Sequence, residues 1–537
     1  MRTSAFAIIV LTLVFFCTNF SYSQNDLPVH KQGMFTASGN CKMCHNGNSG
    51  ANTYRGEDVS QPSTWRATMM SNSSADPFWR AKVDAELMSV KSKVIQKAAS
   101  DLCLKCHSPM GYTQSVADGK SAEYTTEKSY SDLLATDGVS CALCHQIQPD
   151  NLGLQESYKG NYKIGKERMI FGPYKDVKTP KGLHEEFKPV FGEHLNRSEF
   201  CAVCHTVITP RVTENEEISG EFLEQTPYIE WKNSGYPESG INCQSCHMPA
   251  IESPIDIASV PADDTTKRTP FYRHQFVGGN ASLQKIFTKN ADELKLKSSP
   301  SFHDSKLKET IANLQDNALS LSGEAKLNGE NLEIKVKLEN QAGHKLPTGI
   351  PFRRMWVHLT VKDSKGGIVF ESGAYDAEGK IIGTDENHYL HYPEITKPEQ
   401  VQIYEGVMAD ASGKRTFSLL KADRYVKDNR IPPSGFTSVH PSYDTCRIIG
   451  NANEDPDFNK DAKGNEGAGS DIVTYKISGI KETGFDITVE VLYQSFPPEM
   501  VEYLGKTDSP SIVSFISMYK KSDIQPVLLK SITLKTN

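Results

Sequence analysis

One five-residue pattern, Cys-x-x-Cys-His, occurs five times between residues 41 and 247. A chain of this composition would contain roughly 0.007 such matches by chance, so the repetition is not a coincidence. Ten of the twelve cysteines belong to the pattern. The five copies place their cysteines and their final histidine at Cys41, Cys44 and His45, at Cys103, Cys106 and His107, at Cys141, Cys144 and His145, at Cys201, Cys204 and His205, and at Cys243, Cys246 and His247.

The spacing within the pattern matches the covalent attachment of a haem. Two cysteines three positions apart can each form a thioether with one of the two vinyl groups of the macrocycle. The histidine that follows directly can then bind the iron from the same side, as its proximal ligand. The sequence therefore predicts five covalently bound haem c groups, each with its iron.

Zinc, a dithiol redox centre and disulfides are the alternative interpretations of these cysteines. Zinc knuckles combine in pairs or with distant histidines, and they give no reason for a histidine after every second cysteine. A thioredoxin-like pair occurs once, in a strand-then-helix context, rather than five times. Disulfides are permitted in an exported protein but leave the five histidines without a role. Covalent haem is the preferred interpretation, with zinc or disulfides as the alternatives.

The overall composition limits the other functions. The 59 lysines and arginines are outnumbered by 66 aspartates and glutamates, so there is no basic surplus for binding nucleic acid. Beyond the first two dozen residues no apolar run is long enough to span a membrane. Hydrophobic residues make up 38% of the 537-residue chain, and five porphyrins would add apolar core to a helix- and loop-rich region.

The N-terminus has the features of a secretory signal peptide. Arg2 precedes a nearly uninterrupted apolar stretch over residues 5–17, and small residues suit cleavage before Gln24. We therefore predict a signal peptide over 1–23, which also removes Cys17. Export to the periplasm or an equivalent bacterial compartment follows from this prediction. An uncleaved N-terminal anchor helix is the alternative.

Side chains outside the motifs are candidates for the second axial ligand of each iron. An iron with two protein ligands is suited to electron transfer, whereas an open position can bind a substrate. The alternative for each histidine is a surface loop, and the alternative for the methionine is packing against a porphyrin or a helix. The candidates in the haem region are His30, His184, His194, His274 and Met70.

Several segments around the motifs resemble the multihaem cytochrome c-552/c-554 superfamily. This superfamily includes the tetrahaem electron carrier of ammonia oxidation and is related to hydroxylamine oxidoreductase-like proteins. The resemblance covers about residues 30–280. It rests on Trp65-x-x-Thr68-x-Met70 followed by Asp76-Pro77, on Asp137-Gly-Val-Ser-Cys141, on Ser198-Glu-Phe-Cys201, on Glu230-Trp231-x-x-Ser234 and on Cys243-Gln-Ser-Cys-His-Met-Pro249.

The resemblance implies electron transfer and adds detail to the axial ligands. The position of Met70 is often a histidine in that superfamily, so Met70 becomes the preferred methionine ligand of a haem with raised potential. The same substitution is equally compatible with an open iron. The correspondence also favours His194 and His274 as distal ligands. Pentahaem nitrite reductases are less similar, because they characteristically have lysine in place of the last motif residue at the catalytic haem.

The pattern of the sequence changes after the last motif. A haem domain over 24–280 is followed by a predicted helical connector over 281–322, in which Leu307 and Leu319 are among the apolar residues at helical spacing. Residues 323–537 are then predicted to form an all-β, immunoglobulin-like sandwich, which makes the whole chain an α+β multidomain protein. Alternation of apolar and polar residues predicts its strands at Leu332, Ile334, Val336 and Leu338, at Met355, Val357, Leu359 and Val361, and at Phe485, Ile487, Val489 and Val491.

Three further features of the C-terminal region bear on function. The segment around His344 resembles part of a domain often attached to such cytochromes, and His344 is a candidate ligand to an iron across the domain boundary. A hydrogen-bonded loop histidine is the alternative. The acidic segment 451–470 lacks the Gly and Glu of an EF-hand, with Ala462 and Ala468 in their places, and is predicted to be a flexible surface loop. Cys446 is predicted to be a buried thiol.

These observations predict an exported pentahaem c-type cytochrome that transfers electrons between redox partner proteins, such as a membrane quinol-linked partner or another cytochrome. No catalytic residue is assigned. The main alternative is a multihaem oxidoreductase in which one open haem acts on a small nitrogen or sulfur compound. A third hypothesis makes the β domain the main actor and the haem region its electron supply.

Overall fold

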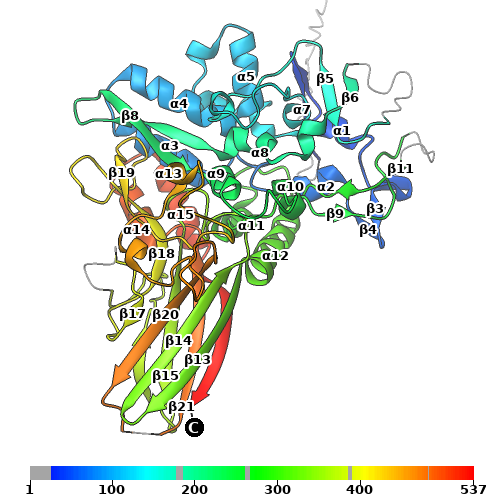
Figure 1. The fold of residues 1–537 in the computed structure, drawn as a ribbon. Helices are drawn as coiled ribbons and strands as arrows, with labels where there is room; N and C mark the ends of the chain where they lie inside the picture. Colours follow the sequence, from blue (N-terminus) through cyan, green and yellow to red (C-terminus); the bar gives the residue numbers. More distant parts are fainter. Residues whose placement is uncertain (1–25, 177–185, 261–266, 385–389, 482, 537) are drawn as a thin grey trace, which may run out of the picture.

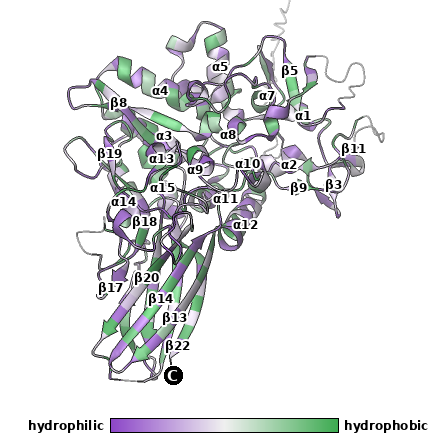
Figure 2. Ribbon diagram, viewed as in Figure 1, coloured by the Kyte–Doolittle hydropathy of each residue, from purple (hydrophilic) through white to green (hydrophobic). Residues whose placement is uncertain are grey.

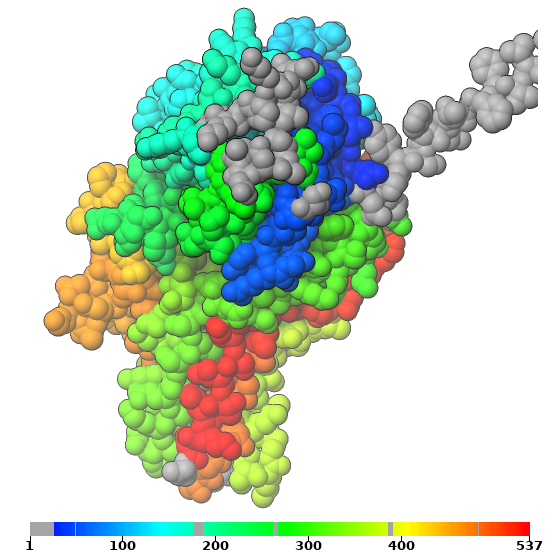
Figure 3. Space-filling model, turned by 90° about the vertical axis from the view of Figure 1, so that its right-hand side faces the viewer, coloured from blue at the N-terminus to red at the C-terminus, as the bar shows by residue number. Residues whose placement is uncertain are grey.

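A computed structural model of the chain describes residues 26–176, 186–260, 267–384, 390–481 and 483–536. The predicted signal peptide and His184 lie outside these residues. Among the described residues, no helix combines the length and the hydropathy needed to cross a membrane. Figure 1 shows a helix-rich part above a long sheet-rich part, and Figure 3 shows the second part as a narrower stem.

The N-terminal part is built from short helices and two-stranded ribbons. Its longest helices begin at capping side chains, with Asp76 accepting from the backbone of Phe78 and Trp79, and Ser92 accepting from that of Ile95. The helices are α1 (Ser38–Lys42), α2 (Gln61–Trp65), α3 (Pro77–Met88), α4 (Lys93–His107), α5 (Pro109–Ala117), α6 (Thr126–Ser129), α7 (Cys141–Cys144), α8 (Ser198–His205), α9 (Pro227–Lys232) and α10 (Cys243–His247).

The ribbons of this part pair strands that are close in the sequence. The antiparallel pairs are β1 (Lys31–Gln32) with β2 (Phe35–Thr36), β3 (Thr53–Tyr54) with β4 (Glu57–Asp58), β7 (Val207–Val212) with β8 (Ile218–Gln225), β9 (Ala250–Ile251) with β12 (Phe271–Tyr272), and β10 (Ile255–Asp256) with β11 (Lys267–Arg268). A parallel pair joins β5 (Met169–Gly172) to β6 (Lys188–Phe191). This combination of short elements leaves much of the part as loop.

The connector forms two helices, α11 (Ala281–Asn290) and α12 (Pro300–Asn317). Helix α12 includes Leu307, as the sequence predicts. Leu319, predicted to continue the helix, instead starts strand β13 and pairs with Asn340. The alternation of side chains along β13 places Leu319 in the core of the sandwich, where it is 1% exposed.

The C-terminal part is a sandwich of two sheets. The first has the order β13 (Leu319–Asn328), β14 (Asn331–Asn340), β20 (Ser470–Ser478) and β17 (Glu394–Ile395). The second has the order β19 (Arg424–Asp428), β18 (Ile403–Ala409), β15 (Arg354–Lys362), β21 (Phe485–Gln494) and β22 (Val527–Thr536), with β16 (Ile368–Ser372) also on β15. Three helices complete this part: α13 (Tyr443–Cys446), α14 (Pro498–Leu504) and α15 (Pro510–Lys521).

The predicted alternating strands are confirmed in β14, β15 and β21. Their apolar side chains form one core between the two sheets, with Ile334 of β14, Val357 of β15 and Val489 of β21 fully buried. Figure 2 shows the resulting alternation of hydrophobic and hydrophilic residues along these strands. The immunoglobulin-like topology of the sandwich stays a prediction.

A second core joins the two parts of the molecule. Phe78 of α3 stacks on Phe496 at a centroid distance of 4.7 Å and meets the edge of Phe515 in α15 at 5.4 Å. Glu86, which lies further along the same helix, is buried and accepts hydrogen bonds from the 418–420 loop. The C-terminal part is therefore packed against the N-terminal part rather than tethered to it.

Replacing Phe78 with alanine should lower the free energy of unfolding by about 3–5 kcal/mol, because it removes the aromatic side chain at the centre of this joint core. Chemical denaturation of the cofactor-loaded protein measures the change. Ile368→Ala, at a β16 position that is 56% exposed, is the control and should stay close to the parent. Equal, small effects at both positions would show that the joint core does not hold the parts together.

The acidic segment 451–470 is only partly the surface loop that its composition suggests. Asp455, Phe458 and Asn459 are each 2% exposed, whereas residues 453, 454, 456 and 461–466 are exposed. The reason is a buried partner, since His391 donates from Nε2 to Asp455 at 2.8 Å. Cys446 is 4% exposed and free, which confirms the predicted buried thiol.

Candidate haem sites

Each Cys-x-x-Cys-His motif lies on or at the end of a helix. The motifs of α4, α8 and α10 are wholly helical, α7 contains two cysteines and ends at Cys144, and α1 contains Cys41 and ends at Lys42. Residues three apart share one face of a helix. Both thiols of a motif therefore face the same side, as attachment to one macrocycle requires.

Among the described residues, the motif residues form no disulfide and belong to no close group of three potential metal ligands. Every cysteine in the described residues is a free thiol. Within those residues, one group of three potential metal ligands lies close together. It consists of His391, Asp455 and Asp471 and contains no motif residue. Neither alternative to haem attachment therefore finds support in the geometry.

Four of the five motif histidines are held by a backbone carbonyl at Nδ1. The acceptors and distances are Ile257 O at 2.6 Å for His45, Ser73 O at 3.3 Å for His107, Phe171 O at 2.6 Å for His145 and Val277 O at 2.7 Å for His247. A proton on Nδ1 leaves the lone pair on Nε2 for a metal. This orientation is the usual support for a metal-binding histidine.

The fifth motif histidine, His205, belongs to the exposed residues of the described chain. Burial lowers its pKa to about 4, yet its surface remains exposed. Burial likewise lowers the pKa of His107 to about 4, and Trp79 stacks on that ring at 4.6 Å. Both rings are therefore neutral, and a neutral imidazole is the form that binds a metal.

Two motif histidines face a second imidazole at a defined separation. The ring centroids of His145 and His274 are 6.3 Å apart, and those of His247 and His344 are 6.4 Å apart. Metal–imidazole bonds of about 2.0 Å on each side, plus about 1.2 Å from nitrogen to ring centre, add up to about 6.4 Å. Both pairs therefore have the spacing of two imidazoles bound to one metal ion.

The two facing histidines are themselves positioned by the backbone. His274 contacts Tyr272 O through Nδ1 at 3.0 Å, and burial together with His145 lowers its pKa to about 3. His344 contacts Lys345 O through Nδ1 at 3.1 Å, and burial lowers its pKa. The lowered pKa values favour the neutral rings, and the contact at Nδ1 leaves Nε2 as the nitrogen suited to a metal. The structure thus brings two sequence-predicted distal candidates opposite motif histidines, one of them from the C-terminal part.

The other distal candidates are not paired in this way among the described residues. His194 uses Nε2 to contact Ile147 O at 2.9 Å, and its ring packs on Phe171, the residue whose carbonyl holds His145. It therefore lies on the proximal side of the third motif. The Nε2 atom of His30 is buried without a partner. Met70 is half-buried, and its carbonyl accepts from Val139 beside the third motif.

One buried histidine was missed by the sequence reasoning. His303 in α12 is 0% exposed, both of its ring nitrogens lack partners, and burial lowers its pKa to about 4. Its helical spacing to Lys306, Thr310 and Leu314, which are buried on the same face, is the signal that would have found it. No motif ring faces it in the described residues.

The motifs are close to one another in space. The thiols of Cys41 and Cys141, of Cys106 and Cys204, and of Cys201 and Cys243 are close enough for one member of each pair to shift the pKa of the other. The fourth motif therefore neighbours the second and the fifth. Cys144 of the third motif also interacts with both cysteines of the fourth. All five motifs form one connected group with the fourth at its centre.

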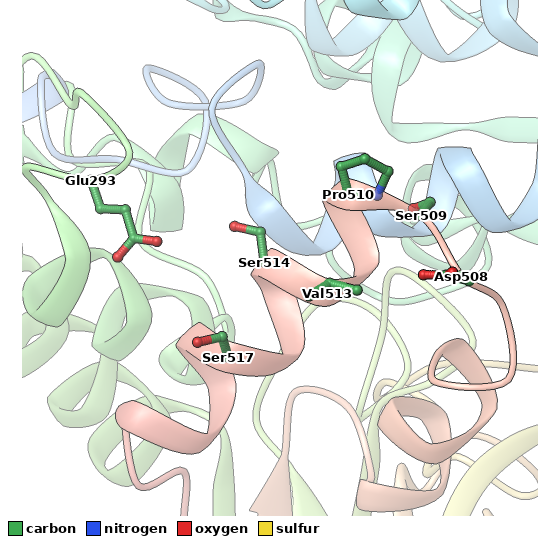
Figure 4. A pocket seen from close by; sticks show the side chains of 7 residues that line it. All are labelled: Glu293, Asp508, Ser509, Pro510, Val513, Ser514 and Ser517. Carbon is green, nitrogen blue, oxygen red and sulfur yellow. The ribbon is translucent and has the colours of Figure 1, made fainter.

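Two other features of the surface and core are separate from this group. A surface hollow of about 610 Å³ lies along α15 and contains no motif residue (Figure 4).

In the His391 cluster, Gln402 and Asn429 both donate side-chain N–H groups to Nδ1 of His391. The side-chain oxygens of Gln402 and Asn429 are fixed by the backbone N–H groups of Tyr392 and Glu405. Nε2 of His391 therefore carries the proton and is not a metal ligand.

Comparisons with known proteins agree with the fold. No protein-family model matches the chain, and no curated protein matches it. The crystal structure of a penta-heme cytochrome c552 from Thermochromatium tepidum is similar, with a TM-score of 0.52 and 17% identity, over 88% of this chain and 94% of that chain. At this identity the likeness concerns the fold. The matched share of this chain is longer than the helical part and the connector together, so the match includes residues of the sandwich.

Proposed function

We propose that the chain is a pentahaem c-type cytochrome that transfers electrons between redox partners. The observation that carries this proposal is the pair of facing imidazoles, His145 with His274 and His247 with His344, at the separation that one iron between them requires. The five motifs supply covalent attachment and a proximal histidine for each haem. The penta-heme neighbour supports the proposal through its fold.

The protein residues have distinct tasks in this proposal. The paired cysteines hold each macrocycle by thioether bonds, and the carbonyls behind His45, His107, His145 and His247 fix the ring that binds the iron. His274 and His344 would each supply a second imidazole to one iron and would keep other ligands away from it. When bound, haem iron supplies reversible one-electron redox chemistry.

Electron transfer between haems depends on their proximity, and neighbouring motif cysteines would place the attached haems close together. A haem attached at the fourth motif would lie beside those of the second, third and fifth motifs, because their cysteines are close enough to influence one another's pKa. The first motif joins the group through Cys41 and Cys141. Electrons that enter at any haem can therefore reach the others without leaving the protein.

The proposal includes several features that follow from the sequence. We place the protein in the cytochrome c-552/c-554 superfamily, with Met70 and His30 as further axial candidates and an immunoglobulin-like C-terminal domain. Covalent haem attachment fits an exported protein, so the predicted signal peptide and a periplasmic location belong to the same proposal. The partners are redox proteins, with no role for nucleic acid.

Haem content tests the proposal. Expression in a bacterium that matures c-type cytochromes should give a protein with five haems per chain, measured as the pyridine haemochrome against protein mass. The haems should stay attached in denaturant and acid acetone, because thioether bonds hold them. A protein that carries zinc, or haem that acid acetone extracts, would contradict the proposal.

A further inference from the structure

The fifth haem position is made by both parts of the molecule. His247 belongs to α10 in the N-terminal part, whereas His344 lies in the 341–353 loop between β14 and β15 of the sandwich. The loop rests on the N-terminal part, since the hydroxyl of Tyr236 donates to Gln341 O at 2.9 Å. Anything that holds this loop in place therefore also holds His344 opposite His247.

One buried carboxylate of the N-terminal part holds the residues that flank His344. Glu230 of α9 accepts through Oε2 from the backbone N–H of Lys345 at 3.1 Å and from the hydroxyl of Thr348 at 2.6 Å. The side chain of Glu230 is fully buried. The same loop is braced from its own part, because Asn340 donates to His344 O at 2.7 Å.

Glu230 is also one member of a buried group of four charges. Its Oε1 pairs with Arg430 at 3.0 Å, and Arg430 forms two parallel bonds to Asp428, at 2.8 and 2.7 Å. Asp428 in turn pairs with the ammonium of Lys345 at 2.7 Å. Two anions and two cations compensate one another, so the group is neutral and can stay buried.

The group connects the two parts only through Glu230. Asp428, Arg430 and Lys345 all belong to the C-terminal part, and Glu230 comes from the N-terminal part. Without Glu230, the guanidinium of Arg430 would keep only one of its two carboxylate partners, and the backbone N–H of Lys345 would lose its acceptor. A buried charge or donor without its partner favours local rearrangement, here of the residue next to His344.

We infer that Glu230 is a positioning residue for the fifth haem: through Lys345, Thr348 and Arg430 it holds His344 on the iron, so that this haem is six-coordinate only while the two parts of the molecule are docked. The inference rests on the proposed haem function and extends it. It makes the coordination of one haem sensitive to the contact between the two parts.

The test is the Glu230→Gln variant of the mature, haem-loaded protein. Glutamine keeps the shape but not the charge, and only one of its two terminal atoms accepts hydrogen bonds. Carbon monoxide should compete with His344 for the ferrous haem about 10- to 100-fold more effectively than in the parent, the range usual for loss of an outer partner of a metal ligand. Titration with carbon monoxide, followed by the Soret band, measures this ratio.

Glu86→Gln is the matched control. Glu86 is a buried carboxylate of the N-terminal part that accepts from Ser418, Leu419 and Leu420 of the C-terminal part, but its loop carries no haem ligand. This variant should bind carbon monoxide like the parent. If carbon monoxide competes more effectively in both variants by the same factor, general loosening of the structure explains the effect, and the inference about Glu230 is wrong.

Two further variants separate the inference from the proposal beneath it. His344→Ala should open one haem fully, and added imidazole should close it again. If His344→Ala opens a haem but Glu230→Gln does not change the titration, the positioning role is overturned and the haem proposal stands. If His344→Ala opens none, the ligand itself is wrong. Should Glu230→Gln fail to fold, Thr348→Val removes one of its bonds and is expected to shift the titration in the same direction.

Discussion

Alanine in place of His344 or His274 is expected to convert one low-spin haem iron into a high-spin, five-coordinate one in each variant, and two in the double variant. The reason is that each histidine is the imidazole facing a motif histidine, at 6.4 and 6.3 Å respectively. Loss of a strong axial ligand leaves an open position on the iron. Electron paramagnetic resonance of the oxidised protein measures the change as a new high-spin signal.

The control for these variants is His358→Ala. His358 contacts the carboxylates of Glu490 and Glu371 in the sandwich and faces no motif ring. Its spectrum should match that of the parent. If His274→Ala and His344→Ala also leave the spectrum unchanged, both facing pairs have another cause and the assigned ligands are incorrect.

The second large effect is expected at the fourth motif. Replacing Cys201 and Cys204 with serine should remove one haem and slow the redistribution of electrons among the remaining four. The fourth motif is the one whose thiols neighbour those of the second and the fifth. Without it, the haem of the second motif loses its described contact with the group. Pulsed one-electron reduction, followed by the absorbance changes of the separate haems, measures the redistribution rate.

The matched comparison removes the first haem by replacing Cys41 and Cys44. This motif is joined to the group through Cys141, so its loss leaves the contacts among the other four in place. Redistribution among those four should keep its parent rate. Equal slowing in both variants would show that the fourth motif is not the centre of the relay. Unchanged low-spin signals from the remaining haems show that each variant is folded.

The cofactor sites could be proposed from the sequence because their chemistry is local. A Cys-x-x-Cys-His motif brings its own attachment points and proximal ligand within five residues, so no tertiary information is needed. The β-strands of the C-terminal part were predictable for a similar reason, since Ile334 and Val336 alternate with polar residues along one strand.

Distal ligands are a different problem, because they depend on contacts between distant segments. His274 and His344 were candidates from the sequence, but only the fold shows which motif histidine each one faces. His194 was equally attractive in the sequence, and the fold places it behind His145 instead. The sequence also gave no sign that Glu230 and Arg430, two hundred residues apart, meet in one buried group.

The boundary between the two parts was the least predictable feature. A change from motifs to alternating strands suggests a separate domain, yet Phe78 packs on Phe496 and Phe515 from the far end of the chain. The acidic segment near Asp455 was misjudged for the same reason. Its composition is typical of a surface loop, but a buried partner, His391, lies in a segment that the local sequence does not identify.

The most direct test of the account is a crystal structure of the mature protein with anomalous scattering measured at the iron absorption edge. We expect five iron peaks, one beside each motif histidine. Two of them should lie midway between ring pairs, one between His145 and His274 and one between His247 and His344. The account would be contradicted if the motifs had no iron peaks, if peaks appeared only at the zinc edge, or if His274 and His344 did not bind iron.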